Sequence, residues 1–389
     1  MEETTSNDSL HTPPPPTYIP LDIIPETILC RLPVKSLLRF RCVCNSWDSL
    51  ISKDLKFAKK HLRVSPKRQH LVTTTWRIAE LLTVMSYPFD SLSLHSTFDS
   101  KGTQLDYSPI IPDNRNGLIA SCDGLLCFII DNRFAALYNP SIKKVKKLPC
   151  IDLPRKKGST LFAFGYDPFI DNYKVVAVFW YKYDVISFGN FKTQANVYSY
   201  TLGTNSWRRI KDLPFMLYFR GYKMSKHGIF ASGTVNWLAY HLSNENSIVS
   251  SHAIISLHLG KESYQEIPQP DYGNSKMLTL DVMRDCLCLF SQESPKSSTH
   301  VWLMKEYGNK ESWIKLICLP CYDDFSHVFI TDIVYISKDD NHVLVVFIGN
   351  REFMWVVYDI KNDTIKSSKI QDNLGLEKSK VYVESLISP

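Results

Sequence analysis

The sequence predicts a multidomain α+β protein: a small all-α unit at residues 18–63, then a large all-β domain at residues 111–389. Apolar residues recur at helical spacing between Leu21 and Leu62. After Pro112 the pattern changes to short apolar runs separated by Gly, Asn, Asp and Pro, which is typical of strands and turns. A hairpin pattern also repeats through the large domain. It favours a β-propeller-like array, with an antiparallel β-sandwich as the alternative.

The first 17 residues form an acidic, Pro-rich tail that is expected to be disordered. The tail lacks the apolar core of a signal peptide, and no apolar run of about 18 residues follows it, so no membrane span is expected. We therefore expect a protein of the cytoplasm, the nucleus or both. Its ten cysteines are then expected to be buried thiols rather than disulfides.

Helix boundaries within residues 18–63 can be predicted from proline and from capping residues. Pro25 suits a first helical turn, where its missing N–H costs nothing, and Pro33 separates that helix from the next. Ser46 and Asp54 are candidate N-caps for two further short helices.

The middle helix carries two apolar faces. One face holds Val34, Leu37, Leu38 and Cys42, and the other holds Phe40, Val43 and Trp47. A unit of about 40 residues has too small a core to bury both faces. The surface left over predicts a protein partner, whereas the simpler interpretation is a helical hairpin packed on the rest of the chain.

The run from Ile24-Pro25-Glu26 to Leu32-Pro33, Leu37-Leu38 and Arg39-Phe40-Arg41-Cys42, followed by Trp47, resembles an F-box. The form is that of the large plant family with a C-terminal F-box-associated domain, often labelled F-box/kelch-repeat. The resemblance implies docking to a Skp-type adaptor and, through it, to a cullin–RING ubiquitin ligase. It assigns adaptor contact, or the small core beneath it, to Leu21, Ile24, Pro25, Leu32, Pro33, Leu37, Leu38, Val43 and Trp47.

Most of the positive charge lies in and just after this helical unit. Eleven Lys or Arg and two Asp or Glu fall between Arg31 and Arg68, whereas the rest of the chain carries 34 basic and 37 acidic residues. A basic docking surface suits an acidic protein partner. Nucleic acid is the rival partner, but it is not expected because the charge coincides with apolar residues rather than with an aromatic-lined groove.

A hairpin repeat runs through the large domain. In four copies an apolar residue that ends one strand is followed seven residues later by the start of the next; a fifth copy has two extra residues in its turn. The pairs are Tyr138 with Val145, Tyr200 with Trp207, Leu257 with Tyr264, Met304 with Trp313, and Tyr358 with Ile365. Successive copies lie 47 to 62 residues apart, which suits one propeller blade each. The Gly-Gly doublet of kelch blades is absent, so the likeness to kelch is one of spacing alone.

Residues 64–110 are expected to connect the two domains, with His70-Leu71-Val72 and the segment 77–85 as candidate strands within them.

No pattern indicates catalytic, metal or cofactor chemistry. The sequence has no P-loop, Gly-x-Gly-x-x-Gly or Gly-x-Ser-x-Gly motif, and the pair Cys318 and Cys321 lacks a second pair at zinc-site spacing. We therefore expect a non-catalytic, substrate-recognition subunit that holds a target for ubiquitination and degradation, without a cofactor. The alternative is a carbohydrate-binding or enzymatic propeller with a helical appendage.

The target is expected to bind the longest connections between repeat strands, which are residues 149–161, 182–194, 244–251 and 292–299. The first two combine positive charge with aromatic side chains, a mixture common at protein interfaces. The candidate target-binding residues are Arg155, Lys156, Lys157, Tyr183, Phe188 and Phe191. Alternatively, the aromatic side chains pack back onto a sheet.

Overall fold

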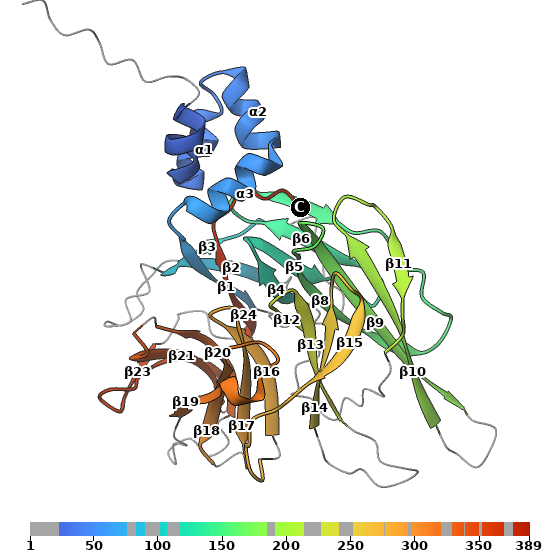
Figure 1. The fold of residues 1–389 in the computed structure, drawn as a ribbon. Helices are drawn as coiled ribbons and strands as arrows, with labels where there is room; N and C mark the ends of the chain where they lie inside the picture. Colours follow the sequence, from blue (N-terminus) through green and yellow to red (C-terminus); the bar gives the residue numbers. More distant parts are fainter. Residues whose placement is uncertain are drawn as a thin grey trace, which may run out of the picture. The chain divides into compact units, whose positions relative to one another are not determined.

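The structure is a computed structural model that describes residues 23–75, 83–89, 102–106, 117–184, 191–213, 227–240, 252–275, 277–294, 297–319, 329–337, 339–349, 352–368 and 376–389. The chain divides into two compact units, Met1–Pro66 and Lys67–Pro389 (Figure 1). The first is helical and the second consists of β-sheets.

The helical unit contains a π-turn, a 3-10 turn and three α-helices. These are η1 (Ile24–Ile28), η2 (Leu29–Arg31), α1 (Val34–Phe40), α2 (Asn45–Lys53) and α3 (Leu55–Val64). Two predicted boundaries are confirmed: Pro25 lies in the first turn of η1, and Asp54 caps α3 by accepting a hydrogen bond from the Phe57 amide at 2.9 Å.

The predicted N-cap at Ser46 is wrong. The extended Cys44 precedes α2, and its carbonyl accepts the first helical hydrogen bond, from the Asp48 amide at 3.0 Å. The helix therefore begins before Ser46, which lies inside its first turn.

The strands of the second unit form, within the described residues, six four-stranded antiparallel sheets. Three of them consist of β4 (Leu118–Cys122), β5 (Leu125–Ile129), β6 (Ala135–Asn139) and β7 (Lys144–Lys147); β8 (Gly158–Asp167), β9 (Asn172–Asp184), β10 (Phe191–Thr201) and β11 (Trp207–Ile210); and β12 (Ile229–Ala231), β13 (Thr234–Tyr240), β14 (His252–His258) and β15 (Ser263–Ile267). The next two consist of β16 (Met277–Met283), β17 (Cys286–Gln292), β18 (Thr299–Met304) and β19 (Trp313–Leu319); and β20 (Phe329–Ile336), β21 (His342–Gly349), β22 (Glu352–Asp359) and β23 (Thr364–Ser368). The sixth joins the two ends of the unit, in the order β24 (Leu376–Val383), β1 (Gln69–Thr75), β2 (Thr83–Pro88) and β3 (Thr103–Gln104).

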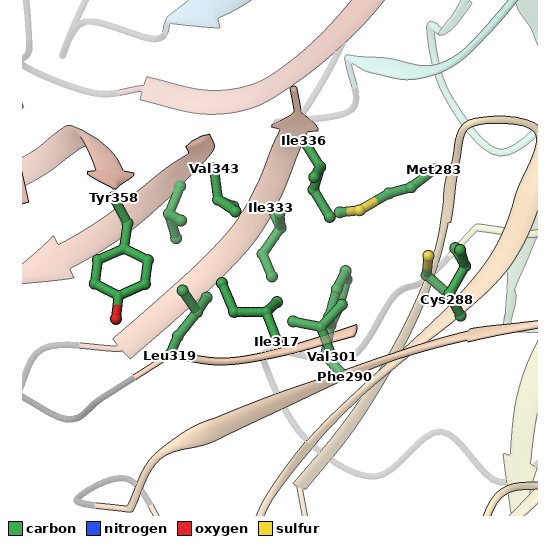
Figure 2. Packing of buried hydrophobic residues seen from close by; sticks show 12 residues of the cluster. Met283, Cys288, Phe290, Val301, Ile317, Leu319, Ile333, Ile336, Val343 and Tyr358 are labelled. Carbon is green, nitrogen blue, oxygen red and sulfur yellow. The ribbon is translucent and has the colours of Figure 1, made fainter. Parts of the chain in front are cut away.

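Successive sheets pack face to face and close a ring. Figure 2 shows one such interface, in which Phe290, Val301 and Ile317 of one sheet face Ile333 and Val343 of the next. Comparable buried clusters join four of the other five pairs of neighbouring sheets, including the β20–β23 sheet with the β24-β1-β2-β3 sheet, and that sheet with the β4–β7 sheet. The β4–β7 and β8–β11 sheets are joined by hydrogen bonds from the Thr160 amide and hydroxyl to Asn132, at 3.1 and 2.6 Å. The β domain is therefore a six-bladed β-propeller, and the alternative of a two-sheet sandwich is excluded.

The predicted hairpin repeat is confirmed residue by residue. Each predicted pair consists of direct cross-strand partners between the third and fourth strands of a sheet, including Tyr200 with Trp207 and Met304 with Trp313. The other three pairs, Tyr138 with Val145, Leu257 with Tyr264 and Tyr358 with Ile365, hold equivalent places.

Three of the fourth-strand aromatics also reach the preceding sheet. The Trp207 and Trp313 indole N–H groups donate to the carbonyls of Pro149 and Pro268, at 2.7 and 2.8 Å. The Tyr264 hydroxyl donates to the Lys211 carbonyl at 2.7 Å. The repeat thus places an aromatic side chain with a polar N–H or O–H group at three equivalent blade junctions. Each of these groups satisfies a backbone carbonyl that would otherwise lack a hydrogen-bond partner at the junction.

Residues 64–110 do more than connect the units, and the expectation is revised. β1, β2 and β3 lie in this segment and form a blade with the C-terminal β24, in which His70 pairs with Tyr382. Because β24 pairs with β1, each of these two strands covers an edge that the other would leave exposed. The N-terminal strands are therefore part of the propeller.

The C-terminal residues after β24 are held against the β4-β5-β6-β7 sheet. The buried Asn139 amide donates to the Ser385 carbonyl and hydroxyl, both at 3.1 Å, and to the Ile387 carbonyl at 2.7 Å. Gly124 leaves room for this tail: a Cβ there would lie 2.4 Å from the Ser385 hydroxyl, and its φ of +83° suits glycine. We call residues 384–389 the C-terminal latch.

The two ends of the propeller differ. In an antiparallel sheet of this order, connections from first to second strand and from third to fourth strand lie at one end, which we call the turn face. Connections from second to third strand and from sheet to sheet lie at the other end, the loop face. Among the described residues, all ten non-glycine residues with positive φ, Asp123 and Glu262 among them, lie in turns of the turn face. Most described connections of the turn face are therefore short, tight turns, whereas the β2–β3 connection at the same end spans residues 89–102.

Candidate functional site

Exposed apolar side chains concentrate in the helical unit. Among the described residues, seven large apolar side chains are exposed, and five of them belong to this unit: Ile23, Ile28, Val43, Leu55 and Val64. Their exposed fractions run from 40% to 61%, with Val43 the highest. The helical unit is far smaller than the propeller, so its surface is unusually apolar for a free domain and is typical of a docking surface.

The residues predicted to contact the adaptor divide between core and surface. Leu37 is fully buried, while Val43 is the most exposed apolar side chain of the unit. The remaining described members are all half-buried: Ile24, Pro25, Leu32, Pro33, Leu38 and Trp47. Leu21 lies outside the described residues.

Trp47 is oriented by a ring contact. Its ring lies 5.8 Å from that of Phe40, between the end of α1 and the start of α2, and both side chains are half-buried. The predicted second apolar face of the middle helix is therefore spread over two helices, with the exposed Val43 in the turn between them.

Sequence reasoning missed four of the exposed apolar residues, namely Ile23, Ile28, Leu55 and Val64. A signal was present for one of them: Ile28 lies four residues after Ile24, the spacing of one helical turn. The others lie at the ends of helical segments, where periodicity gives little information about exposure.

The turn between α1 and α2 is fixed by an ion pair. The Arg41 Nε lies 2.9 Å from the Asp48 Oδ1, and the Ser52 hydroxyl donates to the same oxygen at 2.8 Å. The hydrogen bond from Arg41 is the main reason that the pKa of Asp48 is lowered. This pair sets the geometry around Val43 and Trp47.

Several further cations of the helical unit lie outside any described ion pair. Within residues 23–66 as described, six exposed basic side chains form no ion pair: Arg31, Lys35, Arg39, Lys53, Lys56 and Arg63. Exposed apolar side chains beside uncompensated positive charge suit a protein partner with an acidic surface.

The core beneath this surface is complete. Leu29, Val34, Leu37, Ile51 and Phe57 are buried within the helical unit. The buried His61 contacts the Leu32 carbonyl through Nε2 at 2.8 Å, which fixes α3 against the turn before Pro33. The surface residues therefore have a folded support.

The structure places the candidate target-binding residues unequally. Arg155, Lys156 and Lys157 are exposed in the β7–β8 connection. Tyr183 and Phe191 lie in β9 and β10, but their side chains are outside what the structure describes, as is the whole of Phe188.

The predicted connection at 182–194 is shorter than expected. β9 and β10 continue pairing as far as Asp184 with Phe191, so the strands take up both ends of the predicted loop. The alternation of aromatic and polar residues in this stretch, including Tyr181 and Tyr183, is a strand signal that outweighs its Gly and Asn. Only residues 185–190 separate the two strands.

All four predicted long connections leave their strands at the loop face. The segment 149–161 joins one sheet to the next, and the other three join second to third strands. β1 begins at the opposite end, where β24 ends and the Glu384 amide donates to the Arg68 carbonyl at 3.0 Å. The chain therefore enters the propeller at the turn face, away from these connections.

The described residues contain no group of three or more His, Cys, Asp or Glu that could hold a metal ion. The nine cysteines for which the structure gives a position are free thiols rather than disulfides, as predicted. The prediction that they are buried is confirmed for Cys30, Cys122, Cys127 and Cys288 but is wrong for Cys42, Cys44, Cys150 and Cys318, which are exposed. Within the same residues, no helix has both the length and the apolar character needed to cross a bilayer.

Comparison with known proteins assigns both units. Residues 26–59 match the F-box domain model, and residues 80–389 match the model of the F-box associated beta propeller domain. An Arabidopsis thaliana F-box/kelch-repeat protein is 30% identical over 381 residues, covering 96% of each chain. The Arabidopsis thaliana F-box protein CPR1 is 27% identical over 389 residues, covering 95% of this chain and 88% of its own. Among solved structures, TolB from Acinetobacter baumannii is similar over 81% of this chain and 66% of its own, with 9% identity and a TM-score of 0.46.

Proposed function

Because the chain belongs to the family of F-box proteins that carry an F-box-associated β-propeller, we propose that it is the substrate-recognition subunit of a Skp–cullin–F-box ubiquitin ligase. The F-box docks a Skp-type adaptor, the propeller holds a target protein, and the assembled ligase marks that target for degradation. This subunit acts by positioning, so it needs no nucleophile, metal or cofactor of its own.

The observation that carries the proposal is the uncovered apolar surface of the F-box. Ile28, Val43 and their exposed neighbours lie above a completed core and beside unpaired cations. Fully burying one such side chain at an interface contributes roughly 1.5–3 kcal/mol, so a few of them suffice for a stable complex.

The propeller is proposed to hold the target at its loop face. Connections carried by a rigid scaffold are the usual place for recognition. The chain enters at the turn face, so a target at the loop face stays clear of the entry point.

Three of the tryptophans support a receptor better than a carbohydrate-binding propeller. Trp237 is 1% exposed, and the indole N–H groups of Trp207 and Trp313 are bonded to backbone carbonyls. These three side chains are engaged in blade junctions rather than presented as a surface for a sugar ring. The proposed place of action is the cytoplasm, the nucleus or both.

The proposal is tested by separating docking from target binding. Leu32→Ala combined with Pro33→Ala removes two half-buried side chains from the F-box and leaves the propeller unchanged. Tagged wild-type chain and double variant are purified from cells treated with a proteasome inhibitor, and the bound proteins are identified by mass spectrometry.

The wild type is expected to bring down adaptor, cullin and target, whereas the double variant keeps the target and loses adaptor and cullin. Target abundance without inhibitor should fall on expression of the wild type alone. Undiminished adaptor recovery with the double variant would overturn the proposed docking surface, and an unchanged target level would overturn degradation as the outcome.

A further inference from the structure

Six cations gather at the loop face of the β4-β5-β6-β7 sheet. They come from the turn between β5 and β6, the last half of β7, and the connection to β8. The basic rim, as we name this set, consists of Arg133, Lys146, Lys147, Arg155, Lys156 and Lys157. All are exposed except Lys146, which is half-buried.

The three segments of the rim are tied together. The Ile151 amide donates to the Arg133 carbonyl at 3.0 Å, which holds the β7–β8 connection to the β5–β6 turn. The Lys147 Nζ lies 4.6 Å from the centre of the Phe134 ring, in the same turn. Asn132 anchors that turn to β8, because its carbonyl accepts from the Thr160 hydroxyl at 2.6 Å. The cations are therefore presented on a connected scaffold.

The charge of the rim is not compensated. None of its six cations forms an ion pair with any described residue. Of the two carboxylates in these segments, Asp131 is engaged in the turn, where its Oδ1 accepts from the Arg133 and Phe134 amides at 2.6 and 2.8 Å; Asp152 is exposed.

Three exposed arginines elsewhere in the propeller are paired. Arg208 and Arg209 lie on β11, the outer strand of the neighbouring β8–β11 sheet. Arg208 is hydrogen-bonded to Glu262, and Arg209 lies 2.7 Å from Asp212. Arg284 pairs with Asp340 at 2.5 Å on the turn face. Exposed lysines without an ion pair also occur elsewhere, but Lys261 and Lys305 lie in turns that carry a neighbouring carboxylate, Glu262 and Glu306. The rim instead gathers six unpaired cations at one end of a single sheet, which favours an external anionic partner at that place.

Protection of a sheet edge explains only part of the rim. Lysines on an outer strand discourage edge-to-edge pairing of sheets, and Lys146 and Lys147 lie on the outer strand β7. Arg133, Arg155, Lys156 and Lys157 lie off that strand, where this function does not apply.

We propose that the basic rim binds an extended, carboxylate-rich segment of the target protein. The inference rests on the proposed function, since it names the chemistry that the receptor recognises at its loop face. Unpaired Lys and Arg side chains on a fixed scaffold select for carboxylates by charge and hydrogen bonding, and the spread of six cations over three segments suits an extended chain.

The test uses purified full-length chain and a fluorescein-labelled peptide of ten glutamates, with decamers of glutamine and of lysine as controls. Binding is followed by fluorescence anisotropy at low and high salt. Variant R155S/K156S/K157S removes three cations of the rim. Variant K261S/K305S/K310S removes three exposed lysines of the turn face and makes the same change in net charge.

The glutamate peptide is expected to bind the wild type, to weaken in high salt, and to bind R155S/K156S/K157S about tenfold more weakly. The matched turn-face variant should bind it as the wild type does. Absence of binding, or an equal loss in both variants, would overturn the inference. So would tighter binding of a ten-nucleotide single-stranded DNA that is lost in the rim variant, which would assign the rim to nucleic acid.

Adaptor binding is measured on the same preparations. A chain that binds adaptor but not the glutamate peptide retains the proposed function and refutes the acidic target segment. A chain that binds the peptide at the rim but binds no adaptor retains the rim as a site for acidic segments and refutes the proposed function.

Discussion

The two units treat apolar surface in opposite ways. The helical unit exposes five large apolar side chains over a small core, three of them within the residues that match the F-box model, whereas the described residues of the much larger propeller expose two, Phe169 and Ile170. The propeller buries its apolar faces between blades and closes the ring with β24. A unit that completes its own core can stand alone, and one that leaves apolar side chains uncovered is completed by a partner.

The largest effect is expected for Val43→Asp. Val43 is 61% exposed, so the substitution should leave the F-box folded, but it buries an unpaired carboxylate when the adaptor docks. Adaptor affinity should fall about hundredfold or more in a calorimetric titration. Val64→Asp is the matched control, because Val64 is also exposed and follows the residues that match the F-box model. Equal losses in both variants would show that charge alone, and not the location, weakens docking.

The second largest effect is expected on the stability of the propeller, when a buried side chain between two blades is truncated. Trp237 is 1% exposed and packs between two blades with Val235 and Leu257. Trp237→Ala should lower the free energy of unfolding by about 3–5 kcal/mol, measured by denaturant titration. Phe169→Ala, at a side chain that is 65% exposed, should change it by less than about 0.5 kcal/mol. A small effect at Trp237 would contradict the view that the blade interfaces carry the stability.

A smaller effect is expected at the C-terminal latch. Asn139→Ala removes the donor to the Ser385 and Ile387 carbonyls and leaves buried acceptors unsatisfied. The free energy of unfolding should fall by about 1–3 kcal/mol, and carboxypeptidase should trim the C-terminus faster. Asn362→Ala, at an exposed turn residue, should leave the trimming rate unchanged. Equal trimming in both variants would show that the latch is not held by Asn139.

The smallest effect is a pH dependence within the propeller. Burial lowers the pKa of His252. Above about pH 6.5 both folded and unfolded chains hold a neutral imidazole, but below it the unfolded chain takes up the proton first, so stability falls as pH falls.

Replacing His252 by Asn should therefore reduce the loss of melting temperature between about pH 7.5 and about pH 5.5. Burial also lowers the pKa of His300, but that side chain is only half-buried, so His300→Asn should reduce the loss less. Identical pH profiles for wild type and His252→Asn would contradict a contribution from His252.

Strand pairings between residues close together in the sequence could be predicted, whereas pairings between residues far apart in the sequence could not. The pairing of Tyr200 with Trp207 was predictable because both residues belong to one hairpin, whose strands alternate and whose turn has a recognisable length. The pairing of His70 with Tyr382 was not, because no local pattern links residues about 300 positions apart. For this reason residues 64–110 were predicted as a connection although they supply three strands of a blade.

The candidate sites follow the same rule. Arg155, Lys156 and Lys157 are adjacent in sequence and were predicted as candidates from sequence alone, whereas Arg133 joins them only through the hydrogen bond from the Ile151 amide to its carbonyl. In the F-box, the motif predicted adaptor contact for a set of residues, but only the fold separates the buried Leu37 from the exposed Val43. Exposure is a property of packing, which the motif does not specify.

Docking of the F-box to a Skp-type adaptor is tested most directly by the mass of the complex that the chain forms with the purified adaptor. Size-exclusion chromatography with light scattering is applied to full-length chain, adaptor and their mixture, with Val43→Asp and Val64→Asp run in parallel. We expect a complex of one chain with one adaptor for the wild type and for Val64→Asp, and two separate peaks for Val43→Asp. A wild-type chain that elutes alone in the presence of excess adaptor would contradict this expectation.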